Sequence, residues 1–117
     1  MENRNIVLGM IGEERAADYL DNIGYKIIKR NYRCRYGEID IIAMKQEVLC
    51  FIEVKTRASV RYGAPCEAVD ERKKQHIIRC AYDYMDKFGG VYNDIRLEII
   101  ELLYSEGRFY IRHIKEC

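Results

Sequence analysis

The chain has 117 residues, of which 49% are hydrophobic and 33% charged, and its net charge is +1. This length is enough for one domain, expected over residues 1–117, and the single proline and eight glycines exclude a disordered or low-complexity chain. No apolar run approaches the roughly 20 residues that cross a bilayer, and residues 1–8 lack the apolar core of a signal peptide, so a cytoplasmic protein without a membrane partner is expected.

One helix and three strands are predicted in the first half of the chain. Apolar residues recur at helical spacing over residues 8–22, and Gly24 follows them as a stop signal. The second of the strands alternates, whereas the third is apolar enough to be buried on much of both faces. The three strands are expected over residues 25–33, 38–44 and 48–56.

A second helix and two more strands are predicted after a polar loop over residues 57–65. The helix is expected over residues 69–88, with its end at Gly89, and two strands over 95–104 and 108–114 are joined by a tight turn. The order is αβββαββ, in which the first three strands form an antiparallel meander. The second helix then makes a right-handed crossover to a strand parallel to the third. We therefore expect an α/β fold with a mixed central sheet flanked by helices.

Two charged residues interrupt the third predicted strand. Glu53 and Lys55 lie two positions apart and therefore project from the same face of a strand that is otherwise apolar. Because an unpaired buried charge is costly, the two must pair with each other, meet other polar groups or bind an ion. Taken alone, the pair favours a structural ion pair on a partly exposed strand.

Asp40 joins this group if the intervening hairpin has an even number of loop residues. A two-residue loop at 46–47, or a four-residue loop at 45–48, makes paired residue numbers sum to 93 and sets Asp40 opposite Glu53, with Cβ atoms about 4.5–5.5 Å apart. Two carboxylates this close repel each other unless a proton or a cation lies between them, and hard oxygen ligands suit Mg²⁺ or Mn²⁺. A three-residue loop would put the two carboxylates on opposite faces and remove the site.

Glu13 is a candidate fourth member of the group. It shares the inward stripe of small and apolar residues on the first helix, whereas Glu14 turns away from it. A metal ion held by Asp40, Glu53 and Glu13 would polarise a phosphate and generate hydroxide, and Lys55 would orient the water or neutralise developing charge.

Basic side chains near these acids are candidate nucleic-acid contacts. The stretch over residues 26–35 holds five basic residues and no acid, and Tyr32 and Tyr36 lie in or beside it. A charge run is usually only a solvated face, yet its nearness in sequence to Asp40 slightly favours contact. Lys73, on the inward stripe of the second helix, either holds a phosphate or extends to solvent. The candidate contacts are Arg33, Arg35, Arg57, Arg61 and Lys73.

The remaining polar and sulfur-containing residues are expected to be structural. Glu38 would face Lys55 in the same register and is interpreted as its partner. His76 and His113 have no partner at ligand spacing and are expected to be ordinary helix and strand residues. The five cysteines are odd in number and form no CxxC pair, so they are expected to be free thiols, mostly small residues of the core.

Together these residues resemble the PD-(D/E)xK, or restriction-endonuclease-like, nucleases, whose core is an α-helix, a three-strand meander, a helix and a further strand. The chain more closely resembles the YraN-like family of small bacterial proteins assigned to that superfamily and similar to archaeal Holliday-junction resolvases. The resemblance covers nearly the whole chain, with departures in two places. Ile39 stands where the proline that names the motif would be, and Leu97-Glu98 stands where the family usually has Phe-Asp. The matching segments are Gly9 to Glu14, Asn31-Tyr32-Arg33, Gly37 to Asp40, Phe51 to Arg57, Ala68-Val69 with Lys73, and Arg96-Leu97-Glu98.

The resemblance implies Asp40, Glu53 and Lys55 as catalytic residues, with Glu13 as the helix carboxylate found in resolvase-like members. It implies a Mg²⁺- or Mn²⁺-dependent endonuclease that hydrolyses phosphodiester bonds in branched or damaged DNA. A homodimer is expected, because two protomers are needed to cut paired strands. Two other functions remain open. The chain would be a nucleic-acid-binding module that kept the fold without efficient cleavage, or an interaction domain in which the acid-lysine group is purely structural.

Overall fold

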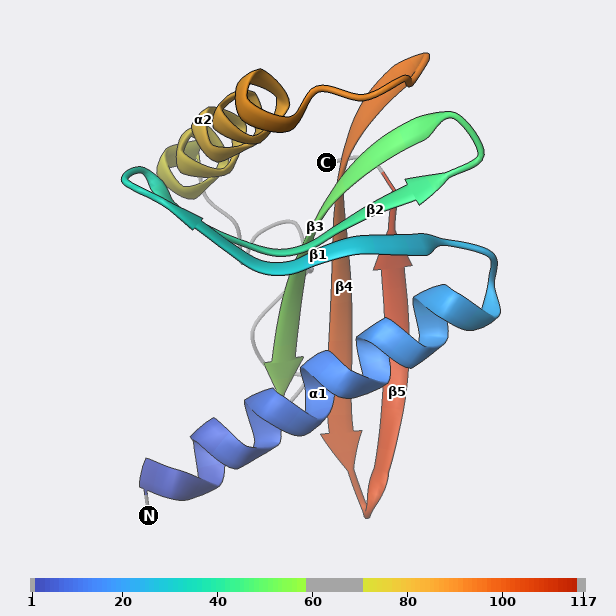
Figure 1. The fold of residues 1–117 in the computed structure, drawn as a ribbon. Coiled ribbons are helices and arrows are strands. Elements are labelled where there is room, and N and C mark those ends of the chain that lie inside the picture. The colour runs from blue at the N-terminus through green and yellow to red at the C-terminus, as the bar shows by residue number, and fades with distance from the viewer. Residues whose placement is uncertain (1, 59–70, 116–117) are drawn as a thin grey trace.

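The computed structural model describes residues 2–58 and 71–115, with side chains from residue 6 onward (Figure 1). These residues form two helices and five strands in the predicted order αβββαββ, which confirms the α/β, restriction-endonuclease-like fold class. The helices are α1 (Glu2–Asn22) and α2 (Glu71–Phe88), and the strands are β1 (Lys26–Cys34), β2 (Gly37–Lys45), β3 (Val48–Arg57), β4 (Asp94–Ser105) and β5 (Arg108–Ile114).

The five strands form one sheet in chain order, from β1 at one edge to β5 at the other. All neighbours are antiparallel except β3 and β4, which run parallel and are connected through α2, as predicted. β3 lies at the centre and is buried from Leu49 to Val54, because both of its faces are covered. In Figure 1 the β1–β2 hairpin crosses the other three strands at a steep angle, so that the far ends of β3, β4 and β5 extend beyond it.

The two helices cover opposite faces of the sheet (Figure 1). On one face the α1 side chains Ala16 and Leu20 share a buried cluster with Ile52 of β3. On the other face the α2 side chain Ile77 shares a second buried cluster with Phe51. Because neighbouring residues of a strand point to opposite faces, β3 contributes to both hydrophobic layers in turn.

Residues in the left-handed region end both helices and close the last hairpin. Gly24, with φ 93°, follows α1, and Gly89, with φ 62°, follows α2, which confirms both predicted helix ends. Glu106 and Gly107 form the two-residue loop between β4 and β5, with φ 52° and 79°, as a type I′ turn requires.

The largest difference from the predicted elements is at the start of α1, which begins at Glu2 rather than at residue 8. The first turns of α1 extend past the sheet, so the apolar residues Ile6, Val7 and Met10 are exposed and give no amphipathic pattern (Figure 1). The predicted start of the second helix, most of the 57–65 loop, Cys66 and Cys117 lie outside the described residues. The three described cysteines, at positions 34, 50 and 80, are free thiols as expected. Neither α1 nor α2 is both long and apolar enough to cross a bilayer.

Candidate active site

The position of Asp40 relative to Glu53 is determined by the β2–β3 hairpin. Its loop has two residues, and all paired residue numbers sum to 93, as predicted. The regular pairing ends at Ile41 and Ile52, one residue before Asp40 and Glu53. Beyond this point the Asp40 side chain, instead of backbone pairing, connects the two strands. Its Oδ2 accepts a hydrogen bond of 2.8 Å from the backbone N–H of Val54. Asp40 and Glu53 therefore lie across from each other at the point where β2 and β3 diverge.

The two carboxylates line a cavity of about 450 Å³ between the sheet and α2. The side chain of Glu53 is only 8% exposed, and Lys73 of α2 reaches it from the solvent side, with Nζ 2.9 Å from Glu53 Oε1. Lys73 thus reaches the acids, and its predicted contact with a phosphate stays a prediction. The other charged or titratable side chains of the cavity lining are Glu38, Arg72 and His76.

Asp40 does not behave as an ordinary carboxylic acid. Burial, and then the nearby charge of Glu53, raise the pKa of Asp40 from 3.8 to about 7, although the hydrogen bond from Val54 acts in the opposite direction. Glu13 and Glu38 contribute further repulsion. Near neutral pH, a proton therefore partly relieves the repulsion between the two carboxylates, and a divalent cation would replace that proton.

Glu13 brings a third carboxylate to this region from α1. It is half-buried, and burial raises its pKa, with Arg30 opposing the shift and Glu38 and Glu53 adding to it. Glu14 points away from the site and pairs with Arg30, with Nη1 2.6 Å from Oε2. The predicted difference between the two neighbouring glutamates is therefore confirmed.

Gly12 explains how α1 comes this close to β3. A Cβ atom at Gly12 would lie 2.0 Å from Thr56 Oγ1, so no side chain fits between the helix and the strand at this point. Because Gly12 precedes Glu13 directly, the same close approach fixes the distance of Glu13 from the Asp40–Glu53 pair.

Asn31 is a site residue that the sequence reasoning did not identify as one. It lies in β1 with φ 53°, a left-handed conformation that asparagine tolerates better than most residues. With its amide nitrogen facing the acids, Asn31 donates hydrogen bonds to Glu13 Oε1 at 3.3 Å and Glu38 Oε1 at 3.0 Å. It thereby connects α1 with β2. The available signal was an asparagine in the middle of a strand, where this residue type is depleted.

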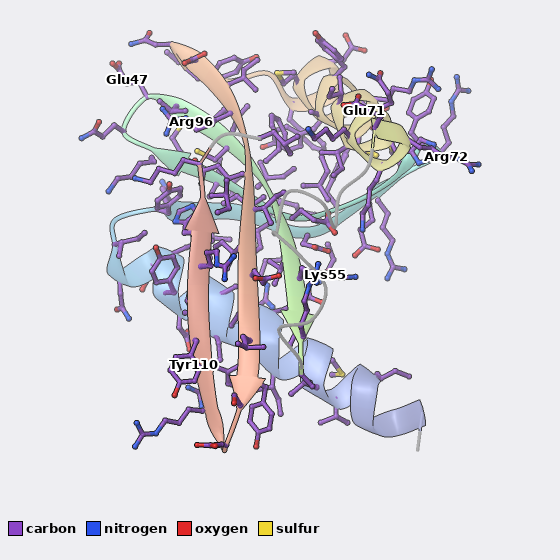
Figure 2. All side chains as sticks on the ribbon, turned by 180° about the vertical axis from the view of Figure 1, so that it is seen from behind. Glu47, Lys55, Glu71, Arg72, Arg96 and Tyr110 are labelled. Carbon is purple, nitrogen blue, oxygen red and sulfur yellow. The ribbon has the colours of Figure 1, made fainter. Side chains whose placement is uncertain are left out.

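Lys55 of β3 is exposed (Figure 2). By alternation along the strand it lies on the same face as Glu53, two residues closer to the C-terminal end of β3. The predicted pairing of Lys55 with Glu38 is wrong. Glu38 Oε2 instead lies 3.2 Å from Arg33 Nε, because β2 and β3 diverge beyond Ile41 and carry Glu38 away from Lys55.

Five basic residues were predicted to contact nucleic acid, and among the four that the structure describes, only Lys73 is brought to the Asp40–Glu53 pair. Arg33 pairs with Glu38, as described, and Arg35 is exposed and stacks on its neighbour Tyr36. Arg57 is 10% exposed and lies against Glu101, with Nε 2.9 Å from Oε2, which leaves little of it for a ligand. Arg61 lies outside the described residues.

The residues present fit a hard divalent cation, with few ligands from the protein. Within residues 2–58 and 71–115, no three His, Cys, Asp or Glu side chains converge closely enough to hold a metal ion. Mg²⁺ is often held by only one or two carboxylates, with water and substrate phosphates completing its shell. The Asp40–Glu53 pair supplies two such carboxylates.

Glu98 and His113 form a separate polar network on the α1 face of the sheet. Glu98 is fully buried and accepts hydrogen bonds from Tyr25, at 3.0 Å, and from His113 Nε2, at 2.7 Å. Tyr19 closes the network, with its hydroxyl 3.0 Å from His113 Nδ1. Burial alone would raise the pKa of Glu98, but hydrogen bonds from His113, Tyr25 and Cys50 lower it overall. His113 is therefore not an ordinary strand residue, and Glu98 is not part of the acid pair.

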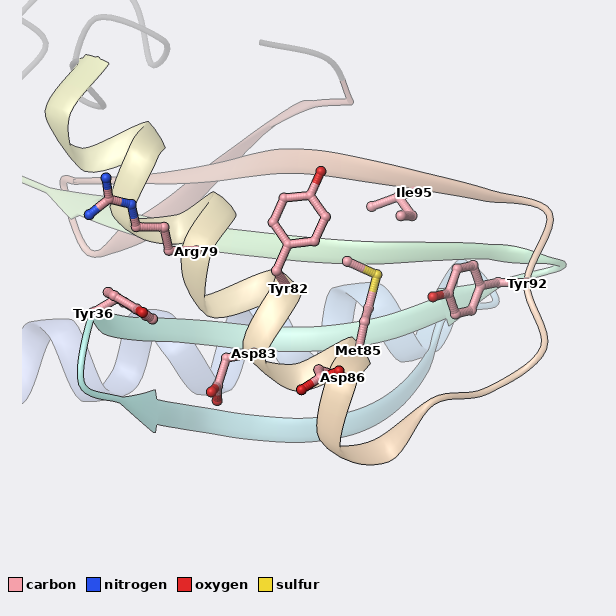
Figure 3. A pocket seen from close by; sticks show the side chains of 8 residues that line it. All are labelled: Tyr36, Arg79, Tyr82, Asp83, Met85, Asp86, Tyr92 and Ile95. Carbon is pink, nitrogen blue, oxygen red and sulfur yellow. The ribbon is translucent and has the colours of Figure 1, made fainter.

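A larger hollow, of about 770 Å³, lies on the outer side of α2 (Figure 3). Its lining includes Tyr36, Tyr82 and Asp83 but neither Asp40 nor Glu53. Of its two acids, Asp83 and Asp86, the first already accepts a hydrogen bond from Tyr32 and pairs with Lys87. The hollow is therefore separate from the Asp40–Glu53 cavity.

Comparison with known proteins places the chain in a family. A family model described as "Uncharacterised protein family UPF0102" matches residues 12–102. A UPF0102 protein of Syntrophomonas wolfei is 41% identical over 110 residues, covering 94% of this chain and 96% of that protein. One of Chlorobium phaeobacteroides is 50% identical over 97 residues, covering 83% and 76%, and one of Alkaliphilus oremlandii is 41% identical over 115 residues, covering 97% and 98%. These names give a family and no activity.

Proposed function

The chain belongs to the uncharacterised protein family UPF0102, and we propose that it is a Mg²⁺- or Mn²⁺-dependent endonuclease of the PD-(D/E)xK superfamily that hydrolyses phosphodiester bonds in DNA. The observation that carries this proposal is the arrangement of Asp40 and Glu53. Two carboxylates from diverging strands face each other in an open cavity, with Lys73 on one side and Lys55 on the same strand face. Branched or damaged DNA as substrate remains a prediction from the family resemblance. A homodimer remains a prediction from the need to cut paired strands, and a cytoplasmic location one from the sequence.

In this mechanism Asp40 and Glu53 would hold the cation, with Glu13 as a further carboxylate near it. The ion would supply Lewis acidity at the phosphate and a water of lowered pKa. Lys55, which is exposed, would orient that water and stabilise the charge that develops on the phosphate. Lys73 neutralises Glu53 in the ion-free protein and would turn to a phosphate oxygen once a cation takes its place.

A second candidate function is a nucleic-acid-binding module without efficient cleavage. Two observations favour it. Lys73 already neutralises Glu53, and within residues 2–58 and 71–115 no third ligating side chain meets the acid pair. A site of this kind would bind phosphate through its lysines while holding a catalytic cation only weakly.

The deciding experiment measures cleavage of supercoiled, linear, single-stranded and four-way-junction DNA with Mn²⁺ present. It compares the wild type with Lys55→Ala and with Lys87→Ala, an exposed lysine of α2 that serves as the matched control. On the best substrate, Lys55→Ala should lose roughly 100-fold or more of the rate, the scale expected when a positioned electrostatic group is removed. Lys87→Ala should cut like the wild type.

Two outcomes would count against the proposal. If Lys55→Ala cuts as fast as the wild type, the cleavage comes from a contaminant or does not involve Lys55. If no substrate is cut while the wild type still binds one of them, the binding-module function is the better explanation.

A further inference from the structure

One part of the sheet face that carries Glu53 is not covered by either described helix. α2 packs over β1 and β2, whereas the far ends of β3, β4 and β5 extend past it (Figures 1 and 2). Ion pairs from Glu101 to Arg57 and to Arg112, at 2.9 and 4.0 Å, place these three side chains on one face. By alternation along the strands, Lys55 and Tyr110 belong to the same face.

The exposed groups on this face are mainly cationic. Lys55, Arg108 and Arg112 are exposed, and Tyr110 lies between the two arginines with 53% of its surface accessible. Glu101, the acid that lies among these cations, is nearly buried against Arg57, so it subtracts little from the positive charge. We call Lys55, Arg108, Tyr110 and Arg112 the basic row.

The sheet register places the basic row next to the acid pair. Lys55 is paired with Glu101 of β4, which is paired with Arg112 of β5. With strands about 4.8 Å apart and a rise of about 3.3 Å per residue, Arg112 lies roughly 10 Å from Lys55, and Arg108 roughly 13 Å further along β5. A stacked nucleic-acid strand carries one phosphate per about 3.4 Å of axis, so the arginines span roughly three or four nucleotides.

We propose that the basic row binds an unpaired nucleic-acid strand and leads it to the Asp40–Glu53 cavity. Lys55, Arg112 and Arg108 contact phosphates that lie a few nucleotides apart, and Tyr110 stacks on an exposed base, which is how strands are held without sequence preference. An acidic peptide would use the same cations but has no base to stack on Tyr110. That the strand is led to a cutting site rests on the proposed function, whereas the binding itself does not.

The test is fluorescence anisotropy with a labelled oligothymidine, in EDTA so that no cleavage occurs, over a series of salt concentrations. The double variant Arg108→Gln/Arg112→Gln should reduce the slope of log K against log salt by about 1.4, since each phosphate contact on a single strand contributes about 0.7. Tyr110→Leu should weaken binding about 5-fold or more with the slope unchanged. The control Arg79→Gln/Lys87→Gln removes two exposed cations of α2, away from the basic row, and should bind like the wild type.

The proposal is overturned if the basic-row variants bind as tightly as the wild type, if the α2 control loses as much affinity, or if polyglutamate competes as well as the oligonucleotide. Because Arg112 lies near Glu101, melting curves must show that the double variant is folded. Arg108→Gln and Tyr110→Leu alone keep the test valid if it is not. Binding that depends on the basic row without any cleavage would contradict only the proposed hydrolysis. Cleavage that needs Lys55 but not Arg108 or Tyr110 would contradict only the basic row.

Discussion

Asp40 keeps a proton to higher pH in the folded chain than in the unfolded chain, and this makes the site a source of instability at alkaline pH. Between pH 3.8 and about 7 the folded state binds more protons at this residue than the unfolded state. The free energy of unfolding therefore falls as pH rises through this window, and the loss is complete above it. Each unit of pKa difference corresponds to about 1.4 kcal/mol.

Asp40→Asn should consequently stabilise the metal-free protein at pH 8. The neutral amide removes the repulsion from Glu53, while its Oδ1 still accepts the hydrogen bond from Val54. We expect a gain of one to a few kcal/mol in the free energy of unfolding at pH 8, since each pKa unit is worth about 1.4 kcal/mol, and a much smaller difference near pH 4. Urea denaturation at the two pH values measures it, and a variant less stable than the wild type at pH 8 would contradict the assignment.

At the scale of single residues, the sequence was sufficient where one hairpin determined the outcome. Asp40 could be placed against Glu53 because both belong to adjacent strands whose register follows from the number of loop residues. The contacts of Asn31 with Glu13 and of His113 with Tyr19 could not be predicted, because both partners lie on α1, whose position on the sheet no hairpin determines. Glu38 was assigned wrongly because no sequence pattern shows where two paired strands begin to diverge.

At the scale of elements, α1 offers a matched pair of glycines. A Cβ at Gly12 would meet Thr56 Oγ1 at 2.0 Å, whereas a Cβ at Gly9 has no atom within 4 Å. Gly9→Ala should stabilise the protein by about 0.5–1 kcal/mol through helix propensity, while Gly12→Ala should destabilise it by about 1–3 kcal/mol through overpacking. Thermal denaturation compares them, and Thr56→Ala should partly rescue Gly12→Ala. Equal effects of the two alanines would show that α1 does not press on β3 here.

The helices and strands themselves were predictable where glycine stop signals and hydrophobic periodicity agreed. Gly24 and Gly89 marked both helix ends, and the bounds of β5 match the predicted strand. The start of α1 was missed because its first turns carry apolar residues on no consistent face, and these turns have no sheet beneath them. Because these turns are not buried, they carry no periodic apolar pattern from which a helix could be predicted.

At the scale of the whole molecule, the candidate site joins two adjacent strands and the helix that packs on them. Asp40 comes from β2, Glu53 from β3 and Glu13 from α1, so an ion bound between them would link both parts of the sheet to a helix. Ligand that binds only the folded state raises its stability by mass action. Mn²⁺ should therefore raise the melting temperature, and by more at pH 8 than at pH 6, because the ion must displace the proton of Asp40.

The carboxylates provide the controls for this measurement. Asp40→Asn and Glu53→Gln should each abolish the Mn²⁺ shift, whereas Glu38→Gln, which removes an acid paired with Arg33, should retain it. Glu13→Gln tests whether the helix carboxylate belongs to the ion site, and we expect it to reduce the shift. An equal shift in all four variants would place the ion elsewhere on the protein.

The two-residue loop of the β2–β3 hairpin has a consequence for how such genes can change in length. Adding one codon between Asp40 and Glu53 would leave every motif legible in the sequence, yet it would turn one carboxylate to the opposite face unless a bulge absorbed the extra residue. Adding two codons would preserve the alignment. The number of residues between Asp40 and Glu53 can therefore change only by even numbers without separating the two carboxylates. Insertions in this interval should be found as pairs of residues wherever the site is in use.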